Sequence, residues 1–217
     1  QVDALIIAST TPGESIIEEC ARIGTPVILF NRFASDTQAN VVCCDNEDGG
    51  RLAANALLDS SYQRLAFMAG TSSTATTLMR EQGFRAQLEA RGYGDYLREE
   101  GMYSYEDGRS AARRLLDRDD PPDAIFCAAD VMALGAVDAA RYDLGIRVPD
   151  ELAVIGFDDI PMASWPAYNL TTIRQPVQQM IETAVQLIIN NDKEIPTGQV
   201  NLLPGELILR GTTRELE

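Results

Sequence analysis

Short apolar runs alternate along this chain with segments in which apolar residues recur every three or four positions. The runs are too short for stable helices and predict buried strands, whereas the recurring segments predict amphipathic helices. The connections between runs are too long for hairpins, so the pattern predicts an α/β fold with parallel sheets and right-handed crossovers. The expected strands lie at residues 3–8, 26–30, 41–44, 64–69, 124–128, 152–155 and 170–173.

The expected helices carry their apolar faces near residues 16–23, 45–57, 78–92, 104–115, 130–140 and 177–188. Ser104 stands three residues before Asp107, which resembles a capping box, and Asp130 is expected to cap the helix that follows it. Residues 200–209 are expected to be extended, with an interruption at Pro204 and Gly205.

The stretch from Arg147 to Asp159 combines a loop, a buried strand and two carboxylates. Gly156 is expected to let the backbone turn sharply after the strand, which leaves Asp158 and Asp159 at its carboxyl end. In an open parallel sheet that end faces the ligand crevice, so Asp158 is the first candidate for a ligand-binding side chain. The alternative is a pair of solvated turn aspartates.

With 217 residues, 45% of them hydrophobic and 24% charged, the chain can form one large domain or two small ones. A net charge of −15 argues against direct binding of nucleic acid phosphates, which needs a basic face. We recognise neither a membrane-spanning run nor a cleavable signal peptide, and the start at Gln1 looks abrupt.

The four cysteines, Cys20, Cys43, Cys44 and Cys127, show no C-x-x-C spacing and are interpreted as reduced, mostly buried thiols of a cytoplasmic protein. The chain has no histidine, which disfavours zinc binding and removes Ser-His-Asp and Cys-His catalysis. We therefore predict no metal, no cofactor and no catalytic residue.

Five stretches carry a family resemblance, in matching order and spacing over nearly the whole chain. They are residues 45–50 (Asp-Asn-Glu-Asp-Gly-Gly), 80–84 (Arg-Glu-Gln-Gly-Phe), 124–135, 148–159 and 170–176 (Leu-Thr-Thr-Ile-Arg-Gln-Pro). Together they resemble the effector-binding core of LacI/GalR-type transcriptional repressors.

The resemblance implies a periplasmic-binding-protein-like fold, in which two doubly wound parallel-sheet subdomains bind a small molecule in the cleft between them. The N-terminal subdomain would hold residues 1–70 plus 175–202, and the C-terminal one residues 71–174 plus 203–217. The family's DNA-binding helix-turn-helix is not found, and residues 3–7 resemble the third strand of its first subdomain. We therefore expect an N-terminally truncated chain whose first subdomain is incomplete and exposes apolar surface.

Three charged residues are site candidates by this resemblance. Arg80 occupies the position of an arginine that binds ligand hydroxyls or carboxylates through its planar donor fork. Asp158 would accept hydrogen bonds from ligand hydroxyls, and Asp48 matches a position that often faces the cleft. The alternatives are a solvated helix arginine for Arg80 and a helix-dipole carboxylate for Asp48.

Further candidates are uncharged. Tyr103 aligns with an aromatic that stacks on a sugar ring, although a core tyrosine fits equally well. Thr76 and Ser9 are expected in loops after strands, at the ligand-binding end of the sheet. Asp130 is interpreted as a helix cap rather than a ligand. Ala129 replaces an asparagine that commonly helps to bind the family's ligands.

The implied function is that of an effector-sensing domain, which binds a sugar or sugar derivative and allosterically controls DNA binding by a homodimer. Operator DNA would be reached only through the missing N-terminal domain. The alternative is a periplasmic solute-binding protein of a transporter, which the sequence upstream of Gln1 would distinguish. An enzyme is a third, disfavoured interpretation.

Overall fold

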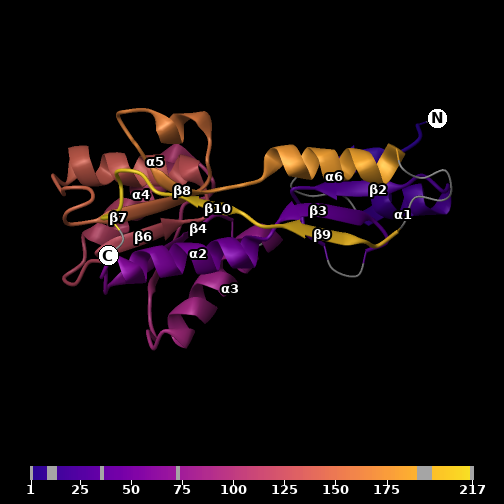
Figure 1. The fold of residues 1–217 in the computed structure, drawn as a ribbon. Coiled ribbons are helices and arrows are strands. Elements are labelled where there is room, and N and C mark those ends of the chain that lie inside the picture. Colours follow the sequence, from indigo (N-terminus) through magenta and orange to yellow (C-terminus); the bar gives the residue numbers. More distant parts are fainter. Residues whose placement is uncertain (1, 9–13, 35–36, 72–73, 190–196, 216–217) are drawn as a thin grey trace. The chain divides into compact units, whose positions relative to one another are not determined.

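The chain folds into two compact units in the computed structural model, which describes residues 2–8, 14–34, 37–71, 74–189 and 197–215. The first unit comprises residues 1–45 and 176–204, and the second comprises residues 46–175 and 205–217. Each unit is a layered α/β structure built on a sheet of mostly parallel strands (Figure 1). The predicted fold class is therefore confirmed.

The first unit contains a four-stranded parallel sheet in the order β1-β2-β3-β9. Its strands are β1 (Leu5–Ile7), β2 (Val27–Phe30), β3 (Asn40–Cys44) and β9 (Val200–Leu203). Its helices are α1 (Glu14–Arg22) and α6 (Val177–Ile189). The strands form because their apolar runs can be buried on both faces.

Alternate residues of the first sheet form its core. The side chains of Val27, Leu29, Val41 and Cys43 pack together on one face, against Ile17 and Cys20 of α1. The intervening residues point to the other face, where α6 packs on β2, β3 and β9. Cys43 and Cys44 thus lie on opposite faces, and both are fully buried.

The second unit contains a six-stranded sheet in the order β10-β8-β7-β6-β4-β5, parallel except for the antiparallel edge strand β10. Its helices lie in two layers, with α2 and α3 on one face of the sheet and α4 and α5 on the other (Figure 1). The strands are β4 (Leu65–Ala69), β5 (Leu97–Glu100), β6 (Ala124–Cys127), β7 (Ala153–Asp158), β8 (Thr171–Arg174) and β10 (Glu206–Ile208).

The helices of this unit are α2 (Asn46–Asp59), α3 (Ala75–Ala90), α4 (Tyr105–Leu116) and α5 (Asp130–Asp138). A π-helical turn (Ala139–Asp143) continues α5, and a short 3₁₀ helix (Pro161–Ser164) follows β7. The predicted cap of α4 is confirmed, since the Ser104 hydroxyl accepts a hydrogen bond from the Asp107 backbone N–H at 3.0 Å. No described helix has the length and apolar character needed to cross a membrane.

Residues 46–70 belong to the second unit, whereas the family resemblance predicts them in the first. Their helix α2 packs on α3, and their strand β4 lies between β5 and β6. The chain consequently first leaves the first unit after Asp45 rather than near Gly70, and crosses again after Gln175 and after Pro204.

Two local expectations, a sharp turn at Gly156 and a helix cap at Asp130, are wrong. Gly156 makes no turn but lies inside β7, where a Cβ atom would come within 2.1 Å of Asp130 Oδ1. Glycine is required there because the Asp130 carboxylate approaches the strand backbone. Asp130 is the first residue of α5 rather than its cap, and Ala129 occupies the cap position.

Candidate functional site

Arg80 is the centre of a polar cluster in the second unit. It lies on α3, and its residue surface is only 4% exposed. A buried guanidinium needs hydrogen-bond partners and a counter-charge to offset its lost hydration. The arrangement around Arg80 shows where those partners come from.

Three segments supply contacts to the Arg80 guanidinium. Its Nε donates to Asn46 Oδ1 at 2.7 Å, and its Nη1 donates to the backbone carbonyl of Ala128. The guanidinium carbon lies 3.6 Å from the centre of the Phe157 ring, a cation–π contact that fixes the plane of the fork. The first turn of α2, the end of β6 and the end of β7 thus hold one side chain in place.

Asp158 provides the counter-charge. It is the last residue of β7, and its Oδ1 lies 3.7 Å from Arg80 Nη2. The same oxygen accepts a hydrogen bond of 2.7 Å from Gln175 Nε2. Burial raises the pKa of Asp158, and the charge of Arg80 and the Gln175 hydrogen bond oppose that rise. The Asp158 side chain is 30% exposed, so a solute can reach it.

Gln175 follows β8 and contributes an unsatisfied acceptor. The residue is 7% exposed, and its Oε1 is buried without a hydrogen-bond partner among the described residues. A buried carbonyl oxygen left without a donor costs free energy. A bound solute or water that donates a hydrogen bond here would recover it.

Asp159 has a different role from its neighbour. Its two carboxylate oxygens accept hydrogen bonds of 2.7 Å from Arg174 and from Arg210. Burial alone would raise the pKa of Asp159, but these two arginines outweigh it and lower the pKa below its usual value. Asp159 therefore joins the turn to β8 and to the C-terminal segment.

Asp130 holds the turn that follows Asp158. Its Oδ2 accepts from the Ile160 backbone N–H at 2.9 Å, and its Oδ1 accepts from the Thr172 hydroxyl at 2.6 Å. Asp158 and Asp159 both adopt positive φ, at +121° and +56°. This backbone is unfavourable for residues other than glycine, and the hydrogen bond to Ile160 secures it.

The hydroxyl of Tyr103 is bound within the protein. It lies 3.2 Å from the hydroxyl of Thr74 and also contacts the hydroxyl of Thr77, both at the start of α3. The Tyr103 ring covers Gly70, where a Cβ atom would come within 2.2 Å of the ring. Stacking of the ring on a sugar stays a prediction.

The other candidates occupy different positions. Asp48 lies in the first turn of α2, and its carboxylate pairs with Arg51. Thr76 is buried in the first turn of α3 rather than in a loop, because α3 begins at Ala75. Ser9 lies outside the described residues. Of the six predicted site residues, the structure joins Arg80 and Asp158 directly.

We call the group formed by Arg80, Asn46, Phe157, Asp158 and Gln175 the Arg80 cluster. It offers both hydrogen-bond donors and hydrogen-bond acceptors. Arg80 supplies donors, whereas Asp158 and Gln175 Oε1 supply acceptors. One positive and one negative charge balance within it. Such a surface suits an uncharged molecule with several hydroxyl groups, since each hydroxyl both donates and accepts.

This chain is similar in sequence to bacterial transcriptional regulators. The HTH-type transcriptional repressor CytR of Escherichia coli K12 is 34% identical over 221 residues, which cover 100% of this chain and 64% of that protein. Catabolite control protein A of Priestia megaterium is 31% identical over 218 residues, covering 99% of this chain and 65% of that protein. The chain thus spans just under two thirds of the length of these relatives.

Solved structures of transcriptional regulators are similar in fold to this chain. A regulatory protein of the LacI family from Chloroflexus aggregans matches with a TM-score of 0.87 at 28% identity, over 98% of this chain and 77% of that one. A complex of the transcriptional regulator CelR with cellobiose matches with a TM-score of 0.84 at 30% identity, over 97% of this chain and 66% of that one.

A family model confirms the fold family. The model of the periplasmic binding protein-like domain matches residues 54–213. The chain therefore belongs to the periplasmic binding protein-like domain family, and it resembles the effector-binding core of the LacI-type transcriptional regulators.

Proposed function

We propose that this chain is the effector-binding core of a LacI-type transcriptional regulator, and that it binds a small, uncharged, sugar-like molecule at the Arg80 cluster. One observation carries the proposal: a buried arginine is held in a fixed plane beside a partly exposed carboxylate and a buried acceptor, Gln175 Oε1, that finds no donor in the described part of the chain. A ligand hydroxyl can donate to Asp158 or Gln175 and accept from Arg80.

The charge balance supports a neutral ligand over an acidic one. Asp158 already neutralises Arg80, so a ligand carboxylate would meet a second negative charge at the same place. The relative CelR, solved with cellobiose, shows that a protein of this fold binds a neutral sugar. Ala129 lacks a side-chain hydrogen-bonding group, so the backbone near it, Arg80 and Asp158 would carry the recognition.

The names of the relatives support a wider function, since these proteins are transcriptional regulators rather than enzymes or transport proteins. We propose that a cytoplasmic homodimer contacts operator DNA through a part of the protein outside residues 1–217. Ligand would favour one conformation of the core and so alter DNA affinity, which is allostery by differential binding. The acidic charge of this chain, −15, fits a module that does not itself touch phosphates.

Thermal unfolding with a set of solutes tests the proposal. The set should contain neutral mono- and disaccharides including cellobiose, sugar acids, polyols and nucleosides. A ligand that binds only the folded state raises the melting temperature. We expect one class of neutral hydroxyl-rich solute to raise the melting temperature of the wild type. The rise should be lost in Asp158→Asn. It should be kept in the control Asp150→Asn, because the Asp150 side chain is 71% exposed. A shift with sugar acids alone, or an equal shift in Asp158→Asn, would contradict the proposal.

A further inference from the structure

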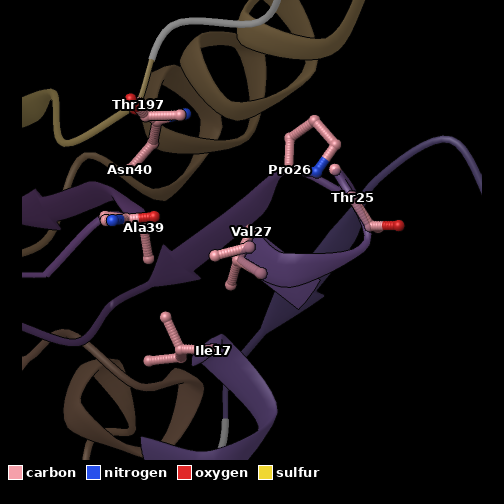
Figure 2. Close-up of a pocket in the computed structure, with 10 residues that line it drawn as sticks. Ile17, Thr25, Pro26, Val27, Ala39, Asn40 and Thr197 are labelled. Atoms are coloured by element: carbon pink, nitrogen blue, oxygen red, sulfur yellow. The ribbon is translucent and has the colours of Figure 1, made fainter. Parts of the chain in front are cut away.

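The first unit contains a cavity of about 310 Å³ at the amino-terminal ends of β2 and β3 (Figure 2). The side chains of Ile17 from α1, Val27 from β2 and Ala39 before β3 form its apolar part. Thr25, Asn40 and Thr197 add polar groups, and all six are labelled in Figure 2. The lining of the cavity therefore combines apolar and polar groups.

This cavity is separate from the Arg80 cluster. The strands β2 and β3 run in parallel away from it, and the far end of β3, Cys44, leads to the first crossing into the second unit. Every member of the Arg80 cluster belongs to the second unit, and the cavity shares no residue with it.

The volume of the cavity suits a small molecule with one or two rings. Ligand pockets span about 300–1,000 Å³, and an engineered cavity of about 150 Å³ holds benzene. The cavity is also accessible, because Ala21 and Gly24, which line it, are exposed. A small molecule can enter without displacing a strand.

The lining decides the charge of the ligand. None of the ten described residues that line the cavity is charged. A charged ligand would lose hydration there without gaining an ion pair, which is costly. We propose that this cavity is a second binding site, for a small uncharged ring compound that carries a hydroxyl or amide group. It would allow a second solute to act on the first unit independently of the sugar-like ligand.

Two probes that differ in charge test the proposal. Benzyl alcohol and benzoate share a ring but differ in charge, and each can be titrated into ¹⁵N-labelled protein while backbone amide shifts are recorded. We expect saturable shifts with benzyl alcohol at Thr25, Val27 and Ala39, and none with benzoate. No saturable shift at these amides, or equal shifts with both probes, would overturn the proposal.

Matched variants locate the binding. Ala21→Phe would fill the mouth of the cavity and weaken benzyl alcohol binding at least tenfold. Glu19→Phe adds the same ring on the opposite side of α1, two positions away, and should leave binding unchanged. Gln38→Trp, at an exposed lining position in a loop, repeats the test should Ala21→Phe fail to fold. Binding that persists in both filling variants, or that is lost in Arg80→Ala, would overturn the proposal.

Discussion

Asp158 and Asp159 are neighbours in sequence with opposite surroundings. Asp159 accepts hydrogen bonds from two arginines, which lower the pKa of its carboxyl against the effect of burial. Asp158 accepts from an amide, and a single arginine lies 3.7 Å away, so burial prevails and raises its pKa. At the residue scale, Asp158 is the carboxylate with interactions left to offer a ligand, and Asp159 serves the fold.

Asp130 makes the stability of the protein depend on pH. Burial raises its pKa to about 6 from the usual 3.8. Between about pH 4 and pH 6 the folded state keeps a proton that the unfolded state releases, so the free energy of unfolding falls as the pH rises. Two pKa units correspond to roughly 3 kcal/mol. Asp130→Asn can still accept a hydrogen bond from the Ile160 N–H and donate one to Thr172. Its free energy of unfolding should not fall in this way as the pH rises.

Denaturant unfolding of both proteins at pH 4, 5, 6 and 7 measures the effect. Relative to the wild type, Asp130→Asn should gain stability steadily across this range. Asp120→Asn removes a carboxylate that is 85% exposed and should follow the wild type at every pH. Parallel pH curves for wild type and Asp130→Asn would refute the role of Asp130.

At the element scale, the contact between α2 and α3 brings two helix backbones unusually close. A Cβ atom at Gly50 would lie 2.1 Å from the Arg80 carbonyl oxygen, and one at Gly83 would lie 1.9 Å from the Glu47 carbonyl oxygen. Backbone atoms cannot swing away as a flexible side chain can. This close packing places the first turn of α2, with Asn46, beside Arg80.

Gly83→Ala tests that packing. The added methyl group should push α2 from α3 and lower the free energy of unfolding by about 3 kcal/mol, at the upper end of overpacking costs. It should also weaken ligand binding, because Asn46 would lose its hydrogen bond to Arg80. Gly94→Ala is the control, since a Cβ atom there meets nothing within 4 Å. Equal unfolding free energies for the two variants would contradict the account.

Most elements could be predicted from the sequence because short apolar runs and helical spacing decide them, but features that depend on tertiary contacts were missed. The edge strand β5, with the sequence Leu-Arg-Glu-Glu, has no apolar run and is held by pairing with β4. Gly156 suggested a turn, whereas its small size serves the approach of Asp130.

The candidate site could be predicted only in part, because some of its residues follow a sequence rule and others meet only through tertiary packing. Arg80 and Asp158 were found through the family resemblance and the carboxyl-end rule for parallel strands. Gln175 follows β8, the neighbour of β7, so the same rule could have found it. Asn46 and Phe157 contact Arg80 through packing that no local pattern reveals.

At the scale of the whole molecule, the first unit leaves part of its apolar surface uncovered. Helix α6 of the first unit exposes an apolar residue at every fourth position, whereas Met180 and Ala184 are buried. A stripe with this spacing runs along one side of a helix. The exposed residues, with their exposures, are Val177 46%, Ile181 46%, Val185 37% and Ile189 68%.

Replacing two residues of this stripe should change association more than stability. In Ile181→Gln/Val185→Gln, binding of an apolar fluorescent dye and concentration-dependent sedimentation should both fall, because exposed apolar area is removed. The free energy of unfolding should change by about 0.5 kcal/mol or less per site. Met180→Gln, on the buried side, should instead destabilise the protein strongly. Unchanged dye binding in the double variant would contradict this description of α6.

Calorimetric titration tests most directly whether the Arg80 cluster binds the effector. The neutral solute that gives the largest melting shift should be titrated into the wild type, Arg80→Ala and Arg85→Ala. Arg85 lies on the same helix with its side chain 57% exposed, so it controls for loss of an arginine. We predict about 100-fold weaker binding in Arg80→Ala, or roughly 2.7 kcal/mol, and unchanged binding in Arg85→Ala. Equal affinities in all three proteins would show that the ligand binds elsewhere.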